Sequence, residues 1–182
     1  MTAVMTQILS FVVTVGVVGI LAHIVGEALP RDAFLWNKFP YAPYTWEEQG
    51  KFYNRKFHIE RWKDHLPDKS KVVKSTVEKS IHATQRTPEH LRRLLQETCV
   101  AEFIHWALLV CSPILLLTMQ GPWSIVMTVL YGLSNIPFIM IQRYNRPRLA
   151  RLYARMGGGM PQTCAQVREK GIRHETADPV VE

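Results

Sequence analysis

Three long apolar stretches stand out along a chain of 182 residues that is otherwise largely polar. They cover about 8–29, 101–119 and 122–141. Each is close to the roughly 20 apolar residues that a helix needs to cross a bilayer. A tight turn at Gly121–Pro122 joins the second and third stretches into an antiparallel hairpin. The pattern predicts an all-α integral membrane protein with three transmembrane helices.

Residues 30–100 separate the first and second stretches, and in their first half aromatic side chains alternate with basic ones. Thr45 and Glu48 have the spacing of a capping box, which predicts that a helix begins at Trp46. Aromatic residues interleaved with lysines and arginines are typical of an amphipathic helix at a membrane interface. We expect this interfacial helix to break near His58. The lysine-rich run that follows, 68–86, predicts a cytoplasmic loop or short helix.

Helix signals also flank the hairpin. Thr87 and Pro88 predict an N-cap and the first residue of the helix that enters the membrane. Pro113 predicts a kink within it. After the third stretch, the chain continues as a basic interfacial helix that ends at Gly157. We therefore expect a single membrane domain over 1–156 and a mobile cytoplasmic tail over 157–182.

The positive charge is unevenly distributed, and the net charge is +7. Of 22 lysines and arginines, 14 lie within 31–93 and 8 within 143–173. Because basic segments stay in the cytoplasm, the N-terminus is predicted outside and the C-terminus inside, in a multi-pass protein of the cell membrane. No nucleic-acid-binding motif accompanies the charge. Its partners are expected to be anionic lipid or an anionic substrate.

Ionisable side chains within apolar stretches are costly to bury, which makes them candidates for function. Glu102 and His105 share one face of the second span. The third span contains Asn135, and the first contains His23 and Glu27 near its end. Each also has a structural interpretation. The acids and histidines can mark the headgroup boundary, and Asn135 can satisfy backbone carbonyls freed by a nearby proline.

The predicted topology places these residues in one layer at the cytoplasmic end of the three spans. Gln142, Arg143, Arg146 and Arg148 lie where the third span leaves the membrane. Arginine binds phosphate and carboxylate groups in a bidentate manner. The arginines therefore predict a binding site for the phosphates of a soluble donor; contact with lipid headgroups is the alternative.

This layer suits group transfer between a membrane lipid and a cytoplasmic donor. His105 is the expected general base that takes a proton from an attacking hydroxyl, and Glu102 is the expected orienting carboxylate. Amides or arginines stabilise the oxyanion of an acyl transfer. Glu102 and His105 also have the Glu-x-x-His spacing of a di-iron site, but such a site needs a second motif of this kind and two further glutamates. No metal ligands are therefore predicted.

Three blocks of the chain are ordered and distinctive: FYNRKFHIERWKDHLP (52–67), ETCVAEFIHW (97–106) and NIPFIMIQRYNRPRL (135–149). They resemble the blocks of the glycosyl-4,4'-diaponeurosporenoate acyltransferase family. The resemblance implies transfer of a fatty acyl group to a sugar hydroxyl of a glycosylated carotenoid or a related glycolipid. The donor would be acyl-CoA or acyl-carrier protein, and no tightly bound cofactor is expected.

The motif positions carry the expected site. The catalytic set is His105 and Glu102, with Asp64 as a second candidate for the orienting carboxylate. The expected donor-binding residues are Arg143, Asn145, Arg146 and Arg148, and the expected acceptor-binding residues are His23, Glu27, Trp62, Lys63, Asn135 and Gln142.

Two other functions stay open at this point. A small membrane methyltransferase or reductase acting on a lipid has a similar hairpin and basic exit, although no glycine-rich nucleotide motif supports it. A non-catalytic lipid-binding subunit of a membrane complex is the other. Three spans are few for a complete site, which favours a homo-oligomer or a complex with other enzymes of the pathway.

Overall fold

The computed structural model describes residues 2–65 and 87–158, and every regular element within these ranges is a helix. Three helical segments are long and apolar enough to span a membrane, Val4–Ala28, Pro88–Thr118 and Pro122–Arg155. The prediction of an all-α membrane protein with three spans is confirmed. The elements are α1 (Thr2–Ala28), η1 (Arg31–Ala33), η2 (Thr45–Gly50), α2 (Lys51–Phe57), α3 (Ile59–Trp62), η3 (Lys63–His65), α5 (Pro88–Cys111), η4 (Ser112–Ile114), α6 (Leu115–Thr118), α7 (Pro122–Ser134) and α8 (Ile136–Arg155).

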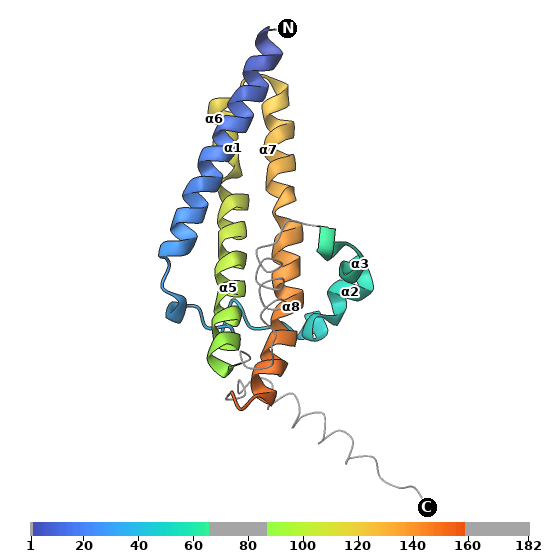
Figure 1. Cartoon of the computed structure of the whole chain (residues 1–182). Helices are drawn as coiled ribbons and strands as arrows, with labels where there is room; N and C mark the ends of the chain where they lie inside the picture. The colour runs from blue at the N-terminus through green and yellow to red at the C-terminus, as the bar shows by residue number, and fades with distance from the viewer. Residues whose placement is uncertain (1, 66–86, 159–182) are drawn as a thin grey trace, which may run out of the picture.

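The second and third spans form the expected hairpin, and α5 packs along α8 (Figure 1). Thr87 caps α5 by accepting a hydrogen bond from the His90 backbone, and Pro88 is the first helical residue, as predicted. Pro113 lies in a 3₁₀ turn that separates α5 from α6, so the predicted interruption is also present. The basic segment after the membrane is not a separate interfacial helix, because α8 continues through it to Arg155.

The first span, α1, is tied to the hairpin at both ends. Arg31 donates hydrogen bonds to the carbonyls of Gly26, Glu27 and Leu29 at 2.7–3.0 Å, and its Nε is 2.9 Å from Glu97 on α5. The last carbonyls of a helix have no partner within the helix and attract cations. Arg31 therefore closes the C-terminal end of α1 and holds it against α5.

The segment after α1 differs from the prediction. No α-helix begins at Trp46, and the cap is formed by Glu47, which accepts a hydrogen bond from the Tyr44 backbone at 2.8 Å. Glu48 and Gln49 adopt left-handed conformations, with φ of 48° and 58°, and α2 begins only at Lys51. The helix starts late because the Glu47 side chain is drawn into the protein interior, where it pairs with Arg143.

The predicted break at His58 is present, with φ of 48° between α2 and α3. These two short helices pack against the lower part of α8 through Tyr53, Ile59 and Tyr144 (Figure 1). The lysine-rich run 68–86 and the predicted tail from residue 159 onward lie outside the described residues.

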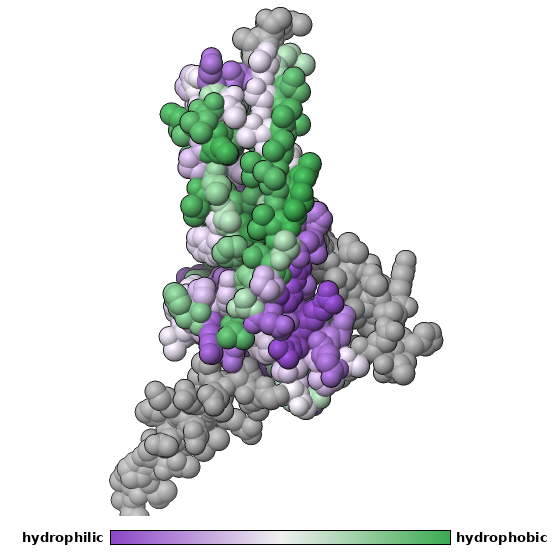
Figure 2. Space-filling view, turned by 90° about the vertical axis from the view of Figure 1, so that its left-hand side faces the viewer, coloured by the Kyte–Doolittle hydropathy of each residue, from purple (hydrophilic) through white to green (hydrophobic). Residues whose placement is uncertain are grey.

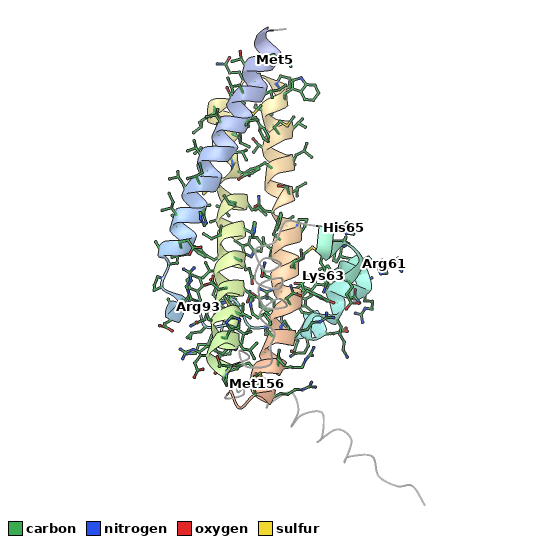
Figure 3. The ribbon with its side chains drawn as sticks, in the orientation of Figure 1. Met5, Arg61, Lys63, His65, Arg93 and Met156 are labelled. Atoms are coloured by element: carbon green, nitrogen blue, oxygen red, sulfur yellow. The ribbon has the colours of Figure 1, made fainter. Side chains whose placement is uncertain are left out.

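The surface divides into two layers along the helix axes. Apolar side chains cover the upper part in the view of Figure 2, and polar ones gather toward the lower part. Figure 3 shows Met5 at the upper end and Arg61, Lys63, His65, Arg93 and Met156 in the lower half. Apolar helices satisfy their backbone internally and can face lipid, so the boundary between the layers is where a membrane lipid meets polar groups.

Candidate active site

A buried cluster of four charged side chains lies at this boundary, between α5, α8 and η2. Glu47, Glu102 and Arg146 are 1–2% exposed, and Arg143 is 8% exposed. Glu102 accepts from the guanidinium groups of Arg143 and Arg146, each at 2.6 Å, through different carboxylate oxygens. Glu47 is 2.5 Å from the Nε of Arg143. Two acids thus balance two bases, as burial of charge requires.

Local sequence explains how the cluster forms. Arg143 and Arg146 are three residues apart on α8, so both project from one helix face toward α5. The segment before η2 meets their remaining donors with backbone oxygens: Arg143 donates to the carbonyl of Pro40 at 3.2 Å, and Arg146 to that of Tyr41 at 2.8 Å. Arg146 also donates to the Thr98 hydroxyl and carbonyl, each at 3.0 Å.

The two acids differ in how fully their oxygens are used. Glu47 accepts four hydrogen bonds, from the Tyr44 backbone, the Tyr53 hydroxyl and two nitrogens of Arg143. Burial, with the adjacent Glu47 carboxylate, raises the pKa of Tyr53 and keeps the phenol protonated. A carboxylate has about four acceptor positions. Glu47 is therefore saturated, whereas within the described structure Glu102 accepts two hydrogen bonds.

A cavity of about 480 Å³ opens beside the cluster. Glu102 and Arg143 form its charged part, and Pro40 and Ile139 contribute apolar contacts. Most of the remaining wall is aromatic: Tyr41, Tyr44, Trp46, Tyr53, Phe103 and Trp106. Small-molecule sites have this size, about 300–1,000 Å³, and this mixture of apolar wall and few polar groups.

His105 belongs to a second polar centre, on the neighbouring side of α5. Its Nδ1 is 3.0 Å from the Asn135 side-chain oxygen, and its ring stacks on Phe138 with centroids 4.6 Å apart. The Asn135 amide nitrogen donates to the Tyr131 carbonyl at 2.9 Å, which orients the Asn135 oxygen toward the histidine. With the Asn135 oxygen as acceptor, Nδ1 is the ring nitrogen that carries the proton in this contact.

Comparison with known proteins identifies the family of the chain. A family model described as glycosyl-4,4'-diaponeurosporenoate acyltransferase matches residues 37–155. The chain belongs to this family. It is therefore an acyltransferase, and the match contains all four residues of the buried cluster. No solved structure matches the chain.

Relatives bearing the name glycosyl-4,4'-diaponeurosporenoate acyltransferase come from Staphylococcus aureus. The protein of strain MRSA252 is 29% identical over 129 residues, which cover 70% of this chain and 76% of the relative. The protein of strain USA300 is 30% identical over the same shares of both chains.

The sequence predicted that polar residues of the three spans lie in one layer, and within this acyltransferase two pairs of them are in contact. Glu102 meets Arg143, and His105 meets Asn135, so the second and third spans do converge as expected. Gln142 is 4% exposed on α8 and Asn145 is half-buried. His23 and Glu27 lie on α1 with exposed side chains, and neither is among the residues that line the cavity.

The expected roles of the charged residues need correction. Both oxygens of Glu102 are engaged by arginines, so the residue seen to orient His105 is Asn135. Arg143 and Arg146 are buried and paired with acids, which does not fit exposure to a donor's phosphates. Asp64 lies in η3, and its side chain is outside the described part of the structure.

Arg148 and Lys63 lie near the ring of Tyr144, which is itself fully buried. Arg148 lies 3.9 Å and Lys63 5.4 Å from the centroid of the Tyr144 ring. Glu60 accepts hydrogen bonds from the Tyr144 hydroxyl and from Arg148, and these two bonds lower the pKa of Glu60 to about 2. The Trp62 indole donates to the Phe57 carbonyl at 2.7 Å, which is a structural contact.

Sequence reasoning missed Glu47 and the tyrosines of the segment before α2. One signal could have identified Glu47. Two arginines predicted at the same depth require two acids to neutralise them, and Glu102 is only one. The other acid had to come from outside the spans, and the aromatic segment that holds Glu47 was already expected at the interface.

Proposed function

We propose that this acyltransferase moves a fatty acyl group from a cytoplasmic thioester donor, acyl-CoA or acyl-carrier protein, to a sugar hydroxyl of a glycosylated carotenoid or related glycolipid. The observation that supports the proposal most is the aromatic cavity, whose wall joins Phe103 and Trp106 of an apolar span to the charged Glu102 and Arg143. A membrane lipid and a water-soluble donor can both reach such a position. The names of the Staphylococcus aureus relatives indicate a glycosylated carotenoid acid as acceptor.

The reaction needs one proton transfer and charge stabilisation. The hydroxyl oxygen attacks the thioester carbonyl carbon, a C–O bond forms, and the C–S bond breaks. We assign the general base to Nε2 of His105, which takes the hydroxyl proton and returns it to the departing thiolate. Asn135 holds the imidazole in the required tautomer. His105 is not among the residues that line the cavity, and it lies one helical turn from Glu102, which is among them. The assignment therefore requires the attacking hydroxyl to extend from the cavity toward His105.

Mass spectrometry of membrane lipids tests this function. Cells that make a glycosylated carotenoid are compared without the protein, with the wild type and with His105→Ala. A glycolipid that gains the mass of a fatty acyl group only with the wild type is the expected result. Absence of any acylated species, or addition of a different group such as methyl, would contradict the proposal.

The donor phosphates are proposed to bind near Arg148 and Lys63, whose side chains lie outside the buried Tyr144 ring. Arg148→Ala should raise the KM for acyl-CoA about tenfold and leave kcat nearly unchanged, because a hydrogen bond to a charged group contributes about 1.5–3 kcal/mol. The matched control is Arg155→Ala, an exposed arginine at the end of the same helix. Equal KM values for Arg148→Ala and the control would show that Arg148 does not bind the donor and only pairs with Glu60.

The orientation in the membrane follows the positive charge. The lower half in Figure 3 carries Arg61, Lys63 and Arg93, and basic segments stay in the cytoplasm. We propose that the turn at Gly121 faces outward. A cysteine introduced at Gln120 is then expected to react with a membrane-impermeant thiol reagent in intact cells, above the background of the native cysteines. If the cysteine reacts only after the cells are lysed, the turn faces the cytoplasm and the proposed orientation is wrong.

A further inference from the structure

The walls of the cavity differ in the environment that they face. Phe103 and Trp106 project from the apolar part of α5 and are 42% and 49% exposed. On the other side, Tyr44 and Trp46 come from the interfacial segment before α2 and are 38% and 53% exposed. Exposed aromatic rings thus border the cavity both toward the lipid layer and toward the interface. A molecule held in the bilayer can reach the cavity sideways, past Phe103 and Trp106.

The aromatic rings present flat apolar faces. Tyr44 and Trp46 are nearly parallel, with centroids 6.1 Å apart and an interplanar angle of 10°. Tyr44 lies against the Arg143 guanidinium, 4.6 Å from its ring centroid. The segment is held firmly, because Glu47 is saturated with hydrogen bonds and Gly50, with φ of 88°, approaches the Tyr144 backbone too closely for a side chain to fit easily. These rings therefore form a rigid wall.

Three parts of the substrates could occupy the cavity: the acyl chain, a donor phosphate or the acceptor sugar. The charged part of the cavity disfavours the first two. An acyl chain buried there would remove water from Glu102 and Arg143 without replacing its hydrogen bonds, which is costly. A phosphate would meet the Glu102 carboxylate, while the positive charge of Arg143 is already balanced by Glu47 and Glu102. A sugar fits both features, since its C–H face stacks on aromatic rings and its hydroxyls can donate to the Glu102 acceptor positions that no group in the described structure occupies.

We propose that the cavity is the acceptor subsite of the enzyme, and that it takes the sugar ring of a membrane glycolipid laterally from the bilayer. This inference rests on the proposed function for the identity of the reaction, but the binding itself needs no donor. The sugar packs against Trp46 and Trp106, a hydroxyl donates to Glu102, and the lipid portion stays in the apolar layer beside Phe103.

Native mass spectrometry of the full-length protein in lipid nanodiscs tests the inference. Nanodiscs of phosphatidylglycerol are doped with equal amounts of monoglucosyl diacylglycerol and diacylglycerol. The wild type should retain the glucosyl lipid at least tenfold more than diacylglycerol. Trp46→Leu and Trp106→Leu should each reduce that preference about tenfold, which corresponds to about 1.4 kcal/mol. The matched control Trp123→Leu, 66% exposed at the far end of the bundle, should keep it.

The possible outcomes separate this inference from the proposed function. No preference for the glucosyl lipid, or equal losses in Trp46→Leu, Trp106→Leu and Trp123→Leu, would overturn the acceptor subsite. Acylated glycolipid in cells together with unchanged binding in the two cavity variants would overturn the subsite and leave acyl transfer standing. Preferential binding without any acylated product would support the subsite and reject acyl transfer.

Discussion

Glu102→Ala is expected to lower the stability of the folded protein by about 3–5 kcal/mol, the cost of leaving a buried charge without its partner. Glu102 is the acid that Arg143 and Arg146 share, and it is 2% exposed. Its removal leaves Arg146 without a carboxylate, because Glu47 reaches only Arg143 in the described structure. Thermal denaturation of the purified protein in a mild detergent measures the loss.

Two further variants make this result specific to the buried cluster. Glu97→Ala removes a half-exposed acid on the same helix that pairs with Arg31, and it should cost about 1 kcal/mol or less. The double variant Glu102→Met with Arg146→Met removes one charge of each sign and should recover most of the stability. A Glu102→Ala protein as stable as Glu97→Ala would show that the cluster contributes little to folding.

His105→Ala is expected to reduce acyl transfer by about 10²–10⁴-fold, the usual contribution of a general base, while the protein stays folded in the membrane. The side chain is half-buried and its contacts with Asn135 and Phe138 are local to the hairpin. Initial rates with acyl-CoA and a glycolipid acceptor, together with the detergent melting temperature, separate the chemical effect from a structural one.

The matched control for His105→Ala is His90→Ala. His90 lies in the first turn of the same helix, outside its apolar part. This control should retain near wild-type rates. Asn135→Ala should fall between the two variants, because it frees the imidazole from its fixed tautomer without removing it. Near wild-type activity of His105→Ala would remove this histidine from the mechanism.

Much of the scaffold was predictable from local sequence, because its signals act over short distances. The apolar stretches, the Thr87–Pro88 helix start, the interruption at Pro113 and the break at His58 all appear where the pattern predicts them. At Thr45 the structure has the 3₁₀ helix η2 and not the predicted α-helix, and its capping box is formed by Tyr44 and Glu47. The predicted box of Thr45 and Glu48 is a local preference of about 1 kcal/mol, whereas Glu47 is held by an ion pair to Arg143, 96 residues away.

In the candidate site, too, the sequence predicted the approximate position of residues but not their contacts. Counting helical turns in a hairpin predicted that Glu102, His105, Asn135 and Arg143 lie in one layer, but not which of them pair. Their roles did not follow, because spacing along a helix does not say which of several neutralising partners a charge will choose. That Arg143 and Arg146 point inward, while Arg148 remains at the surface, depends on where the segment before α2 packs.

The sequence alone determined that this protein is an all-helical membrane acyltransferase, since apolar length, turn residues and the family's three blocks are properties of the chain itself. The tertiary structure decided where the chemistry can occur. It placed Glu47, from outside the spans, beside Arg143, and it assembled a cavity from aromatic rings on two stretches of the chain, 41–53 and 103–106. Burial makes this choice, because a charge removed from water must find an opposite charge wherever the fold supplies one.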